Sequence, residues 1–394
     1  ISLTPVLSKL LESFVGNWML NRVLSRLDMK QFGSLRGRST THALVDMLHT
    51  WHQALDKGQS ARVLFIDFAK AFDRVDHTLV IHNLIDLGIP GSVIRWVASF
   101  LTNRQQRVKI ANHLSSWLEL TGAMPQGSWL GPFTFVILID TLKLSCLTHK
   151  YVDDTTLTEI LSPGQQSSMD VYLSELYQWS DTNFMHINNN KSKEMIITSS
   201  RSVSVSVLPN IDRVAYFKLL GVFVSSDLRW HKHVTYITSK VNSRLHFLRQ
   251  LKRAALSAHD MLNFYVAFIR PVLEYAAPAW HTGLTLEQND NLESLQKRAL
   301  RIIYGGLHFT NSTYEGFCND LKISTLRQRR DQLAQKFFHK LMDPASCLHY
   351  LIPERRDDSQ VSRLRNARPY DIPFARTEKF KNSFILYSLH HYVE

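Results

Sequence analysis

The chain has 394 residues, of which 44% are hydrophobic and 11% aromatic, and it carries a formal net charge of +12. This composition excludes a disordered chain and predicts two or three folded domains. The excess of Lys and Arg favours an acidic polymer as the partner. The three cysteines lie far apart, which excludes a disulfide framework or a cysteine-rich zinc site and indicates a reducing compartment.

The first forty residues predict a helix and then a basic loop. Apolar residues recur at helical spacing over residues 6–28, and Pro5 suits the start of a helix. Arg36 and Arg38 lie in the loop that follows. They fit either a solvated loop or a contact to phosphate or template, because Arg binds phosphate well and is also common on surfaces. A second helix is predicted through residues 40–51.

A buried strand ending in a carboxylate is predicted next. Residues 62–68 form a near-continuous apolar run, which is typical of a strand buried on both faces. The run ends at Asp67, and leaving that carboxylate unpaired would cost too much desolvation energy, so we expect a metal or a cation beside it. Two helices at 78–87 and 91–101 and a strand pair at 104–110 and 117–120 follow.

A pair of aspartates on a hairpin is the next feature that could carry chemistry. The loop at 124–128 contains glycine, which allows close approach of the backbone, and it opens an apolar helical segment at 133–144. In Tyr151-Val152-Asp153-Asp154, alternating side chains would let one aspartate enter a site while the other bends away at the turn. By itself, such a pair is usually a solvated turn.

The second half of the chain reads as mainly helical. A helix at 165–184, a polar turn at 188–193 and a strand at 194–198 precede a hairpin predicted from 202–208 and 213–224, with Leu220-Gly221 in its second limb. No acidic residue occurs from Leu228 to His259, which favours binding to a polyanion over a merely solvated surface. Further helices are predicted at 260–273, 286–304 and 325–342, before a weakly periodic C-terminal stretch.

Three carboxylates thus suggest one site: Asp67, Asp153 and Asp154. Two divalent metal ions need several shared oxygen ligands, and Mg²⁺ prefers carboxylates together with substrate phosphates. A glycine-containing loop and a basic helical arm accompany these residues. Template-directed nucleotidyl transfer is the hypothesis that accounts for all of these features.

Five sequence blocks carry a family resemblance. They are QFGSLRGRST (31–40), FIDFAKAFDRVDH (65–77), MPQGSWLGP (124–132), YVDD (151–154) and KLLGVFV (218–224). In this order they resemble the reverse transcriptase of non-long-terminal-repeat retrotransposons of the jockey-like and chicken-repeat-like group. The segments 268–280 and 295–303 resemble that group's post-palm region, which an intron maturase or telomerase-like polymerase does not match.

The resemblance implies an α+β right-hand polymerase with fingers, an antiparallel-sheet palm and a helical thumb. Residues 1–226 would form the fingers and palm, 227–345 the thumb and post-palm region, and 346–394 a C-terminal extension. The group usually has Arg-Pro directly before Ile-Ser-Leu-Thr. This chain begins at Ile1, so we expect it to be N-terminally truncated and to lack an upstream endonuclease domain.

The resemblance also implies residue roles. Asp67, Asp153 and Asp154 match the catalytic metal ligands, and Phe72 matches a steric gate against the ribose 2′-hydroxyl, although plain core packing would also explain a phenylalanine there. Lys191 resembles a lysine that protonates or steadies pyrophosphate, and the alternative is an exposed turn lysine. The expected substrate contacts are Gln126, Gly127, Arg36 and Arg38; the expected primer grip is Leu220 and Gly221; the expected nucleic-acid contacts are Lys240, Arg244, Arg249, Lys252 and Arg253.

The implied function is RNA-directed DNA polymerisation with two Mg²⁺ ions, for which Mn²⁺ is an alternative. The implied partners are an RNA template, a DNA primer and dNTPs, with the element RNA as a ribonucleoprotein. No apolar run reaches the length of a membrane span and no signal peptide is visible, so we expect an intracellular protein of cytoplasm and nucleus that is not secreted. The alternative is a catalytically inactive nucleic-acid-binding remnant of a transposon polyprotein.

Overall fold

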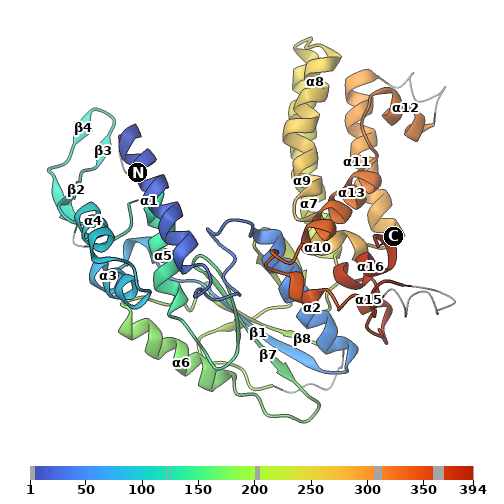
Figure 1. Cartoon of the computed structure of the whole chain (residues 1–394). Coiled ribbons are helices and arrows are strands. Elements are labelled where there is room, and N and C mark those ends of the chain that lie inside the picture. Colours follow the sequence, from blue (N-terminus) through green and yellow to red (C-terminus); the bar gives the residue numbers. More distant parts are fainter. Residues whose placement is uncertain are drawn as a thin grey trace. The chain divides into compact units, whose positions relative to one another are not determined.

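The computed structural model describes residues 5–120, 122–125, 127–199, 205–305, 313–357 and 368–393. They form two compact units, each with helices and strands (Figure 1), which confirms the α+β class. The first unit is drawn from Ile1–Ser39, Arg62–Glu194 and Ser204–Arg213. The second is drawn from Thr40–Ala61, Met195–Val203 and Val214–Glu394.

A five-stranded sheet has the strand order β6-β7-β1-β8-β9. Its strands are β1 (Ser60–Ile66), β6 (Leu147–Tyr151), β7 (Asp154–Leu161), β8 (Lys193–Ile197) and β9 (Asp212–Arg213). Strand β1 is buried along its whole length, as its apolar run predicts. The pair β6–β7 is antiparallel, whereas β8 and β9 are parallel.

The helices of the first unit share a hydrophobic core with the sheet. They are α1 (Val6–Val23), η1 (Ala71–Asp73), α3 (His77–Asp86), α4 (Gly91–Leu101), α5 (Leu130–Asp140) and α6 (Met169–Thr182). Helix α5 is buried along almost its whole length, as its apolar sequence predicts. Four short strands form two antiparallel pairs beside them: β2 (Arg104–Gln106) with β5 (Leu118–Leu120), and β3 (Lys109–Ile110) with β4 (His113–Leu114).

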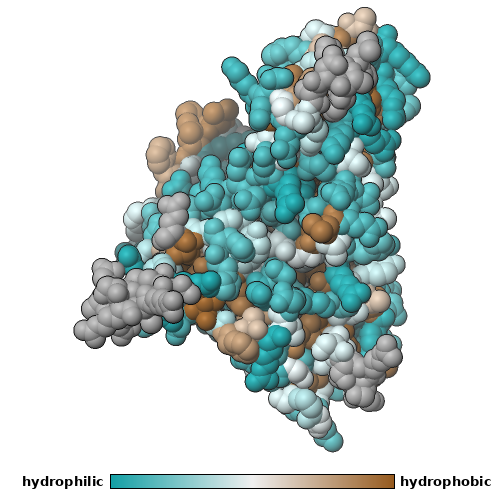
Figure 2. Space-filling view, turned by 90° about the vertical axis from the view of Figure 1, so that its right-hand side faces the viewer, coloured by the Kyte–Doolittle hydropathy of each residue, from teal (hydrophilic) through white to brown (hydrophobic). Residues whose placement is uncertain are grey.

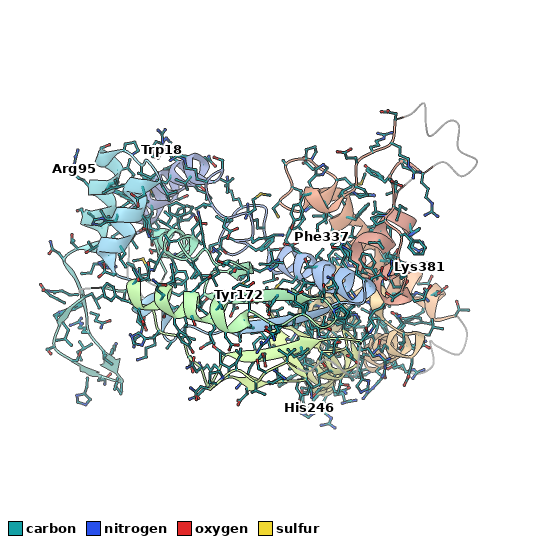
Figure 3. The ribbon with its side chains drawn as sticks, turned by 90° about the horizontal axis from the view of Figure 1, so that it is seen from below. Trp18, Arg95, Tyr172, His246, Phe337 and Lys381 are labelled. Atoms are coloured by element: carbon teal, nitrogen blue, oxygen red, sulfur yellow. The ribbon has the colours of Figure 1, made fainter. Side chains whose placement is uncertain are left out.

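Helix α1 exposes many of its apolar residues, unlike a simple amphipathic helix. Its regularly spaced apolar residues are largely exposed, including Val6 at 76%, Phe14 at 73% and Trp18 at 44% (Figure 3). Val23, which belongs to the predicted spacing, is buried, and so is Met19, which does not. The helix itself is therefore predicted correctly, but its first predicted apolar positions, from Val6 to Trp18, do not lie on the face that packs.

The second unit is mainly helical. Its helices are α2 (Thr40–Asp56), α7 (His231–Arg253), α8 (Ala258–Phe264), η2 (Tyr265–Ile269), α9 (Arg270–Glu274), α10 (Ala277–Trp280), η3 (His281–Gly283), α11 (Leu286–Tyr304), α12 (Tyr314–Asp320), α13 (Leu326–Leu341), η5 (His349–Leu351), α15 (Glu378–Lys381) and α16 (Phe384–His391). The sequence places apolar residues at helical spacing along α7. Of these, Ile237, Val241, Leu245 and Leu248 are buried and Leu251 is half-buried, and the helix packs against α11.

The hairpin predicted from 202–208 and 213–224 is wrong. Residues 202–204 lie outside the described part, 205–208 form no strand, and β9 pairs in parallel with β8. The hairpin that does form joins β10 (Tyr216–Leu219) to β11 (Val222–Ser225). Leu220 and Gly221 are thus its two-residue turn and do not lie in a strand. Pro209-Asn210 resembles a hairpin turn, and Leu-Gly carries a weaker turn signal, which explains the error.

Within the described ranges, no helix is both long and apolar enough to cross a bilayer. Hydrophilic side chains predominate on the face shown in Figure 2, where hydrophobic side chains form only separate small areas. Cys146, Cys318 and Cys347 carry free thiols.

Candidate active site

Three carboxylates lie at neighbouring strand ends in the first unit. Asp67 directly follows β1, Asp153 lies in the turn between β6 and β7, and Asp154 begins β7. Because β7 is adjacent to β1 in the sheet, residues that are far apart in the sequence come together. The structure therefore brings together the three aspartates that the sequence singles out.

Mutual repulsion links these carboxylates. Desolvation and the Asp67 carboxylate raise the pKa of Asp153. Desolvation, then the Asp153 and Asp67 carboxylates, raise the pKa of Asp154 to about 6. Asp67 and Asp153 are half-buried and Asp154 keeps exposed surface, so an ion from solvent can reach the group.

This donor set fits a hard divalent cation. Carboxylate oxygens are the ligands that Mg²⁺ prefers, and repulsion among three negative charges is the strain that such an ion relieves. In the described part of the chain, no group of three His, Cys, Asp or Glu side chains is arranged to hold a metal ion by itself. The aspartates are thus an electrostatically coupled group whose remaining ligands would come from substrate or water.

The turn before the aspartates rests on the segment Gln31–Gly33. Val152 has a φ of 61°, a left-handed conformation that β-branched residues rarely adopt. The Gln31 side chain accepts a hydrogen bond from the Val152 amide at 3.4 Å and from the Gly33 amide at 3.0 Å. A Cβ on Gly33 would lie 2.5 Å from the Val152 nitrogen. Sequence reasoning misses this role, because only the long-range pairing reveals it.

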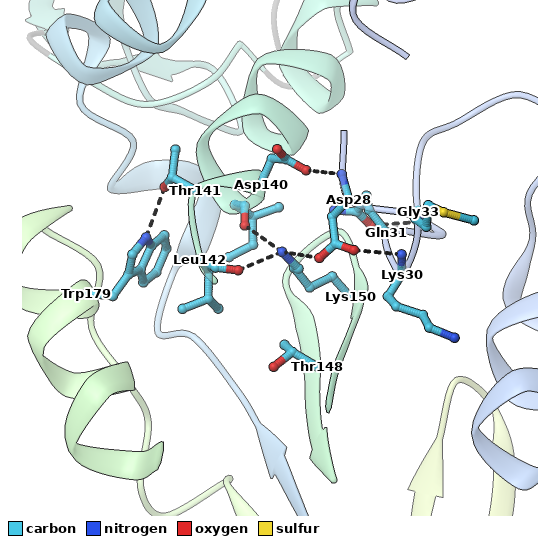
Figure 4. Close-up of polar contacts among 12 residues, drawn as sticks. Asp28, Lys30, Gln31, Gly33, Asp140, Thr141, Leu142, Thr148, Lys150 and Trp179 are labelled. Carbon is cyan, nitrogen blue, oxygen red and sulfur yellow. Dashed lines mark hydrogen bonds and ion pairs between the residues drawn. The ribbon is translucent and has the colours of Figure 1, made fainter. Parts of the chain in front are cut away.

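A buried lysine anchors the strand that leads into this turn (Figure 4). The Lys150 ammonium lies 2.8 Å from Asp28 Oδ2 and donates to the Leu142 carbonyl at 2.7 Å. Although burial alone would raise it, the nearby Lys150 ammonium lowers the pKa of Asp28. Asp140 in turn accepts a hydrogen bond from the Asp28 amide at 2.7 Å. This network joins β6, the end of α5 and the N-terminal loop, and sequence reasoning misses it too.

A cation lies beside Asp67, as its position at the end of a buried strand predicts. The turn around Asn188 packs on the end of β1, because the Asn188 amide donates to the Asp67 carbonyl at 2.8 Å and Ser192 Oγ accepts from the Asp67 amide at 3.2 Å. In the same turn, Lys191 Nζ lies 3.8 Å from Asp67 Oδ2. The Lys191 side chain is 70% exposed, so it is free to move toward a substrate.

The predicted steric gate and nucleotide loop lie next to each other. The Phe72 ring is half-buried and stacks on Phe135 of α5 with a centroid distance of 4.6 Å. Its carbonyl accepts a hydrogen bond from the Met124 amide at 2.8 Å. Gly127 has a φ of 98°, which glycine adopts easily, and Gln126 lies outside the described residues. Packing against Phe135 therefore explains part of the Phe72 environment, and the steric-gate role stays a prediction.

The two arginines of the 31–40 block have different surroundings. Arg36 is exposed. Arg38 Nη1 donates to the carbonyls of Met29, at 3.0 Å, and Gln31, and so closes the loop. The contacts of Arg38 therefore stabilise the segment beneath the turn that carries Asp153 and Asp154, whereas the Arg36 side chain extends into solvent.

In the second unit, a tyrosine holds the predicted primer-grip turn. Leu220 and Gly221 have φ values of 44° and 88°, the pattern of a type I′ hairpin turn. The Tyr275 hydroxyl forms hydrogen bonds with the Leu220 carbonyl at 2.9 Å and Thr40 Oγ1 at 3.0 Å. A Cβ on Gly221 would lie 2.9 Å from the Tyr275 ring. The 268–280 segment stands out in the sequence, but nothing in it singles out Tyr275.

The expected nucleic-acid contacts of α7 divide into two groups. Arg249 and Arg253 are exposed. Lys240 lies over the Tyr236 ring at 4.7 Å, Arg244 donates to the Phe268 carbonyl, and Lys252 donates to the Ile303 carbonyl at 3.2 Å. These three cations thus also stabilise the helix and its neighbours.

Comparisons with known proteins agree on one family. The family described as "Reverse transcriptase (RNA-dependent DNA polymerase)" matches residues 1–239. The RNA-directed DNA polymerase from mobile element jockey of Drosophila melanogaster is 25% identical over 94% of this chain and 43% of its own length. The probable RNA-directed DNA polymerase from transposon BS of the same fly is 26% identical over 90% of this chain and 41% of its own length.

Solved structures with lower similarity include telomerases. The Candida tropicalis telomerase in complex with a TWJ fragment of telomeric RNA has a TM-score of 0.46 and 11% identity, covering 88% of this chain and 56% of that one. The Candida albicans telomerase in a similar complex has a TM-score of 0.44 and 13% identity, covering 77% and 56%.

The chain spans about two fifths of the length of the curated relatives it matches. The resemblance to polymerases of non-long-terminal-repeat retrotransposons is confirmed by these matches. The chain belongs to the reverse transcriptase (RNA-dependent DNA polymerase) family.

Proposed function

We propose that this chain is an RNA-directed DNA polymerase that extends a DNA primer with dNTPs on an RNA template. The observation that carries the proposal is the electrostatic coupling of Asp67, Asp153 and Asp154 at neighbouring strand ends in a chain of this family. Coupled carboxylates with raised pKa values are typical of functional sites.

Asp67, Asp153 and Asp154 would hold two Mg²⁺ ions, for which Mn²⁺ can substitute. When bound, such ions activate an attacking hydroxyl and neutralise the charge of a leaving pyrophosphate. The protein's own contribution is to keep three carboxylates close together. Gln31 and Gly33 stabilise the turn that carries two of them, so we infer that these residues position the aspartates.

Phe72 is our candidate for sugar selection, because its ring is packed against Phe135 on one side and cannot easily move away from an added 2′-hydroxyl. Gln126 and Gly127 would contact the incoming nucleotide and template. Arg36, which is exposed, would contact phosphate, and Arg38 would support the loop that presents it.

Lys191 is our candidate for steadying the pyrophosphate. Its ammonium lies near Asp67 and is largely exposed, so the group can reach an anion without crossing the protein interior. A long flexible amine of this kind can donate a proton or a hydrogen bond to a departing phosphate. The Lys191→Met variant would lose this donor and retain the apolar stem.

The second unit would bind the primer–template duplex. Leu220 and Gly221 form the turn that we propose as the primer grip, and Tyr275 fixes it. Lys240, Arg244, Arg249, Lys252 and Arg253 would follow the phosphates. On this proposal, residues 1–226 form fingers and palm, 227–345 the thumb and post-palm region, and 346–394 an extension. The element RNA would be carried as a ribonucleoprotein between cytoplasm and nucleus.

Primer extension on an RNA template tests the proposal. The wild-type chain should incorporate dNTPs with Mg²⁺, and Asp153→Asn should lower the rate at least about a hundredfold, because one of the three carboxylates that would hold the ions is lost. Asp73→Asn is the matched control: it lies in the 65–77 block and is exposed, and it should retain activity. Duplex binding with steep salt dependence but no incorporation with Mg²⁺ or Mn²⁺ would refute polymerisation and support a binding remnant.

A further inference from the structure

Lysines and tyrosines alternate on a surface formed by the β10–β11 hairpin and the first half of α7. On α7, Lys232, Tyr236 and Lys240 recur at every fourth residue and therefore follow one side of the helix. On β10, Tyr216 and Lys218 are two residues apart and therefore share one face of the hairpin. The two sets meet, because Lys232 Nζ lies 4.5 Å from the centre of the Tyr216 ring. All of these residues belong to the second unit.

Two ammonium groups converge on the Tyr236 ring. Lys218 Nζ, from the hairpin, and Lys240 Nζ, from the helix, lie 5.0 Å and 4.7 Å from the centre of this ring. Hydrogen bonds from Lys218 and then from Lys240 lower the pKa of the Tyr236 hydroxyl, so both ammonium groups lie close to its oxygen. Phe223 packs edge to face against the same ring, with a centroid distance of 4.9 Å. The ring is thus supported by the hairpin, and two like charges meet at its hydroxyl.

No carboxylate of the surrounding segments balances these two charges. Over residues 213–259 the only acidic residue is Asp227, and its carboxylate lies 3.7 Å from Arg229. Neither the Lys218 nor the Lys240 ammonium forms an ion pair with a described residue. Like charges held close together repel each other, and an anion between them removes the repulsion. The local charge therefore favours a negatively charged ligand.

Another contact between a lysine and a tyrosine in this unit shows how such a pair is balanced inside the fold. Lys297 Nζ lies 4.7 Å from the centre of the Tyr314 ring, and the Tyr314 hydroxyl donates a hydrogen bond to the Glu293 carboxylate. One cation, one hydroxyl and one carboxylate are thus packed together. Tyr236 has two cations beside it, and no described carboxylate pairs with them, so an anion from outside the fold would complete the same balance.

The donors at Tyr236 match a backbone phosphate of a nucleic acid. A phosphodiester carries one negative charge and free oxygens that accept hydrogen bonds, and Lys and Tyr side chains are among its usual contacts. Lys218 and Lys240 are exposed and Tyr236 is partly exposed, so a strand outside the protein can reach all three. Aromatic rings interleaved with cations are typical of surfaces that follow a nucleic-acid strand.

We propose that Lys218, Tyr236 and Lys240 jointly bind one backbone phosphate of the primer–template duplex. The two ammonium groups supply the charge, and the Tyr236 hydroxyl, which accepts a hydrogen bond from an ammonium, donates its own proton to a phosphate oxygen. Lys218 lies in the strand that leads into the Leu220–Gly221 turn, so the phosphate binds on the hairpin that carries the proposed primer grip. The assignment rests on the proposed function, because it names a contact of the same duplex.

Fluorescence anisotropy of a labelled DNA primer annealed to an RNA template tests the proposal, with the whole chain, no dNTPs and a series of salt concentrations. The Lys218→Met/Lys240→Met double variant keeps both apolar stems and should reduce the steepness of log K against log salt by about one, because one phosphate contact is lost. Tyr236→Phe keeps the ring and both charges, so it should weaken binding about tenfold and leave the steepness unchanged. Lys297→Met, which removes a lysine that also lies over a tyrosine ring, should bind like wild type.

A reduction in steepness by about two would mean that the lysines contact separate phosphates, and it would overturn the shared site. Wild-type affinity in Tyr236→Phe would overturn it too, as would a wild-type chain that does not bind the duplex. If inorganic phosphate binds saturably while the double variant binds the duplex like wild type, the site takes a free anion and the proposal fails. Primer extension with the same proteins keeps the proposed function separate: weaker duplex binding by the variants supports the phosphate site even where the wild type incorporates nothing.

Discussion

Replacing Gly221 by alanine should destabilise the second unit through two separate effects. At a φ of 88°, an ordinary residue is strained by about 1 kcal/mol relative to glycine. The added Cβ would also lie 2.9 Å from Tyr275 Cε1. If the ring moves, its hydroxyl loses the bonds to Leu220 and Thr40, each contributing about 0.5–1 kcal/mol at this partly exposed site. The sum is a loss of about 2–3 kcal/mol in the free energy of unfolding.

Urea unfolding can separate the two effects. Gly164 has a φ of 80° but nothing within 4 Å of an added Cβ, so Gly164→Ala should show the backbone strain alone, about 1 kcal/mol. In a Tyr275→Ala background, Gly221→Ala should fall to the same value, which gives a coupling of about 1–2 kcal/mol. Equal losses for Gly221→Ala and Gly164→Ala, or strict additivity with Tyr275→Ala, would refute the claim that Tyr275 packs on and fixes the turn.

Three further predictions concern the first unit. The Glu194 carboxylate is fully buried and lies 2.6 Å from the guanidinium groups of both Arg62 and Arg213. Glu194→Gln should therefore lower the free energy of unfolding, measured by urea denaturation, by about 3–5 kcal/mol; a loss below about 1 kcal/mol would contradict the buried pairing. The pKa of Asp154 is about 6 in the folded chain against a reference of 3.8, so between these pH values the folded chain binds more protons than the unfolded chain, and stability should fall as the pH rises. Asp154→Asn should flatten this part of a Tm–pH profile recorded without metal ions, and an unchanged slope would contradict the coupling of the three carboxylates. Gly33→Ala would place a Cβ 2.5 Å from the backbone nitrogen of Val152, in the turn that carries Asp153 and Asp154. On the proposed function, primer extension should then be lost while the circular dichroism spectrum stays close to wild type; full activity would show that the turn tolerates displacement.

The sequence alone predicts those elements whose own residues determine them. Strand β1 and helix α5 are deeply buried, and their apolar runs predict this burial directly. The aspartates stand out because their spacing within several blocks is specific. Their approach in space follows from the β7–β1 pairing, which the family resemblance also implies.

The missed features depend on contacts between distant segments. Nothing local in Gln31 or Gly33 reveals that they support a turn far along the chain. Lys150 looks like a surface residue by composition, yet its ammonium is buried against Asp28 and the Leu142 carbonyl. The β10–β11 hairpin is misplaced by sequence reasoning because Pro209-Asn210 has stronger turn chemistry than Leu-Gly.

Titration of the whole chain with Mn²⁺, followed by electron paramagnetic resonance, tests the central claim most directly. If Asp67, Asp153 and Asp154 form one metal-dependent group, each Asp→Asn variant should weaken Mn²⁺ binding at least about tenfold, because carboxylates are the principal ligands of such ions. The exposed Asp73→Asn variant should bind like wild type. Wild-type affinity in Asp67→Asn would contradict the account, because the strand end and the hairpin would then not act as one site.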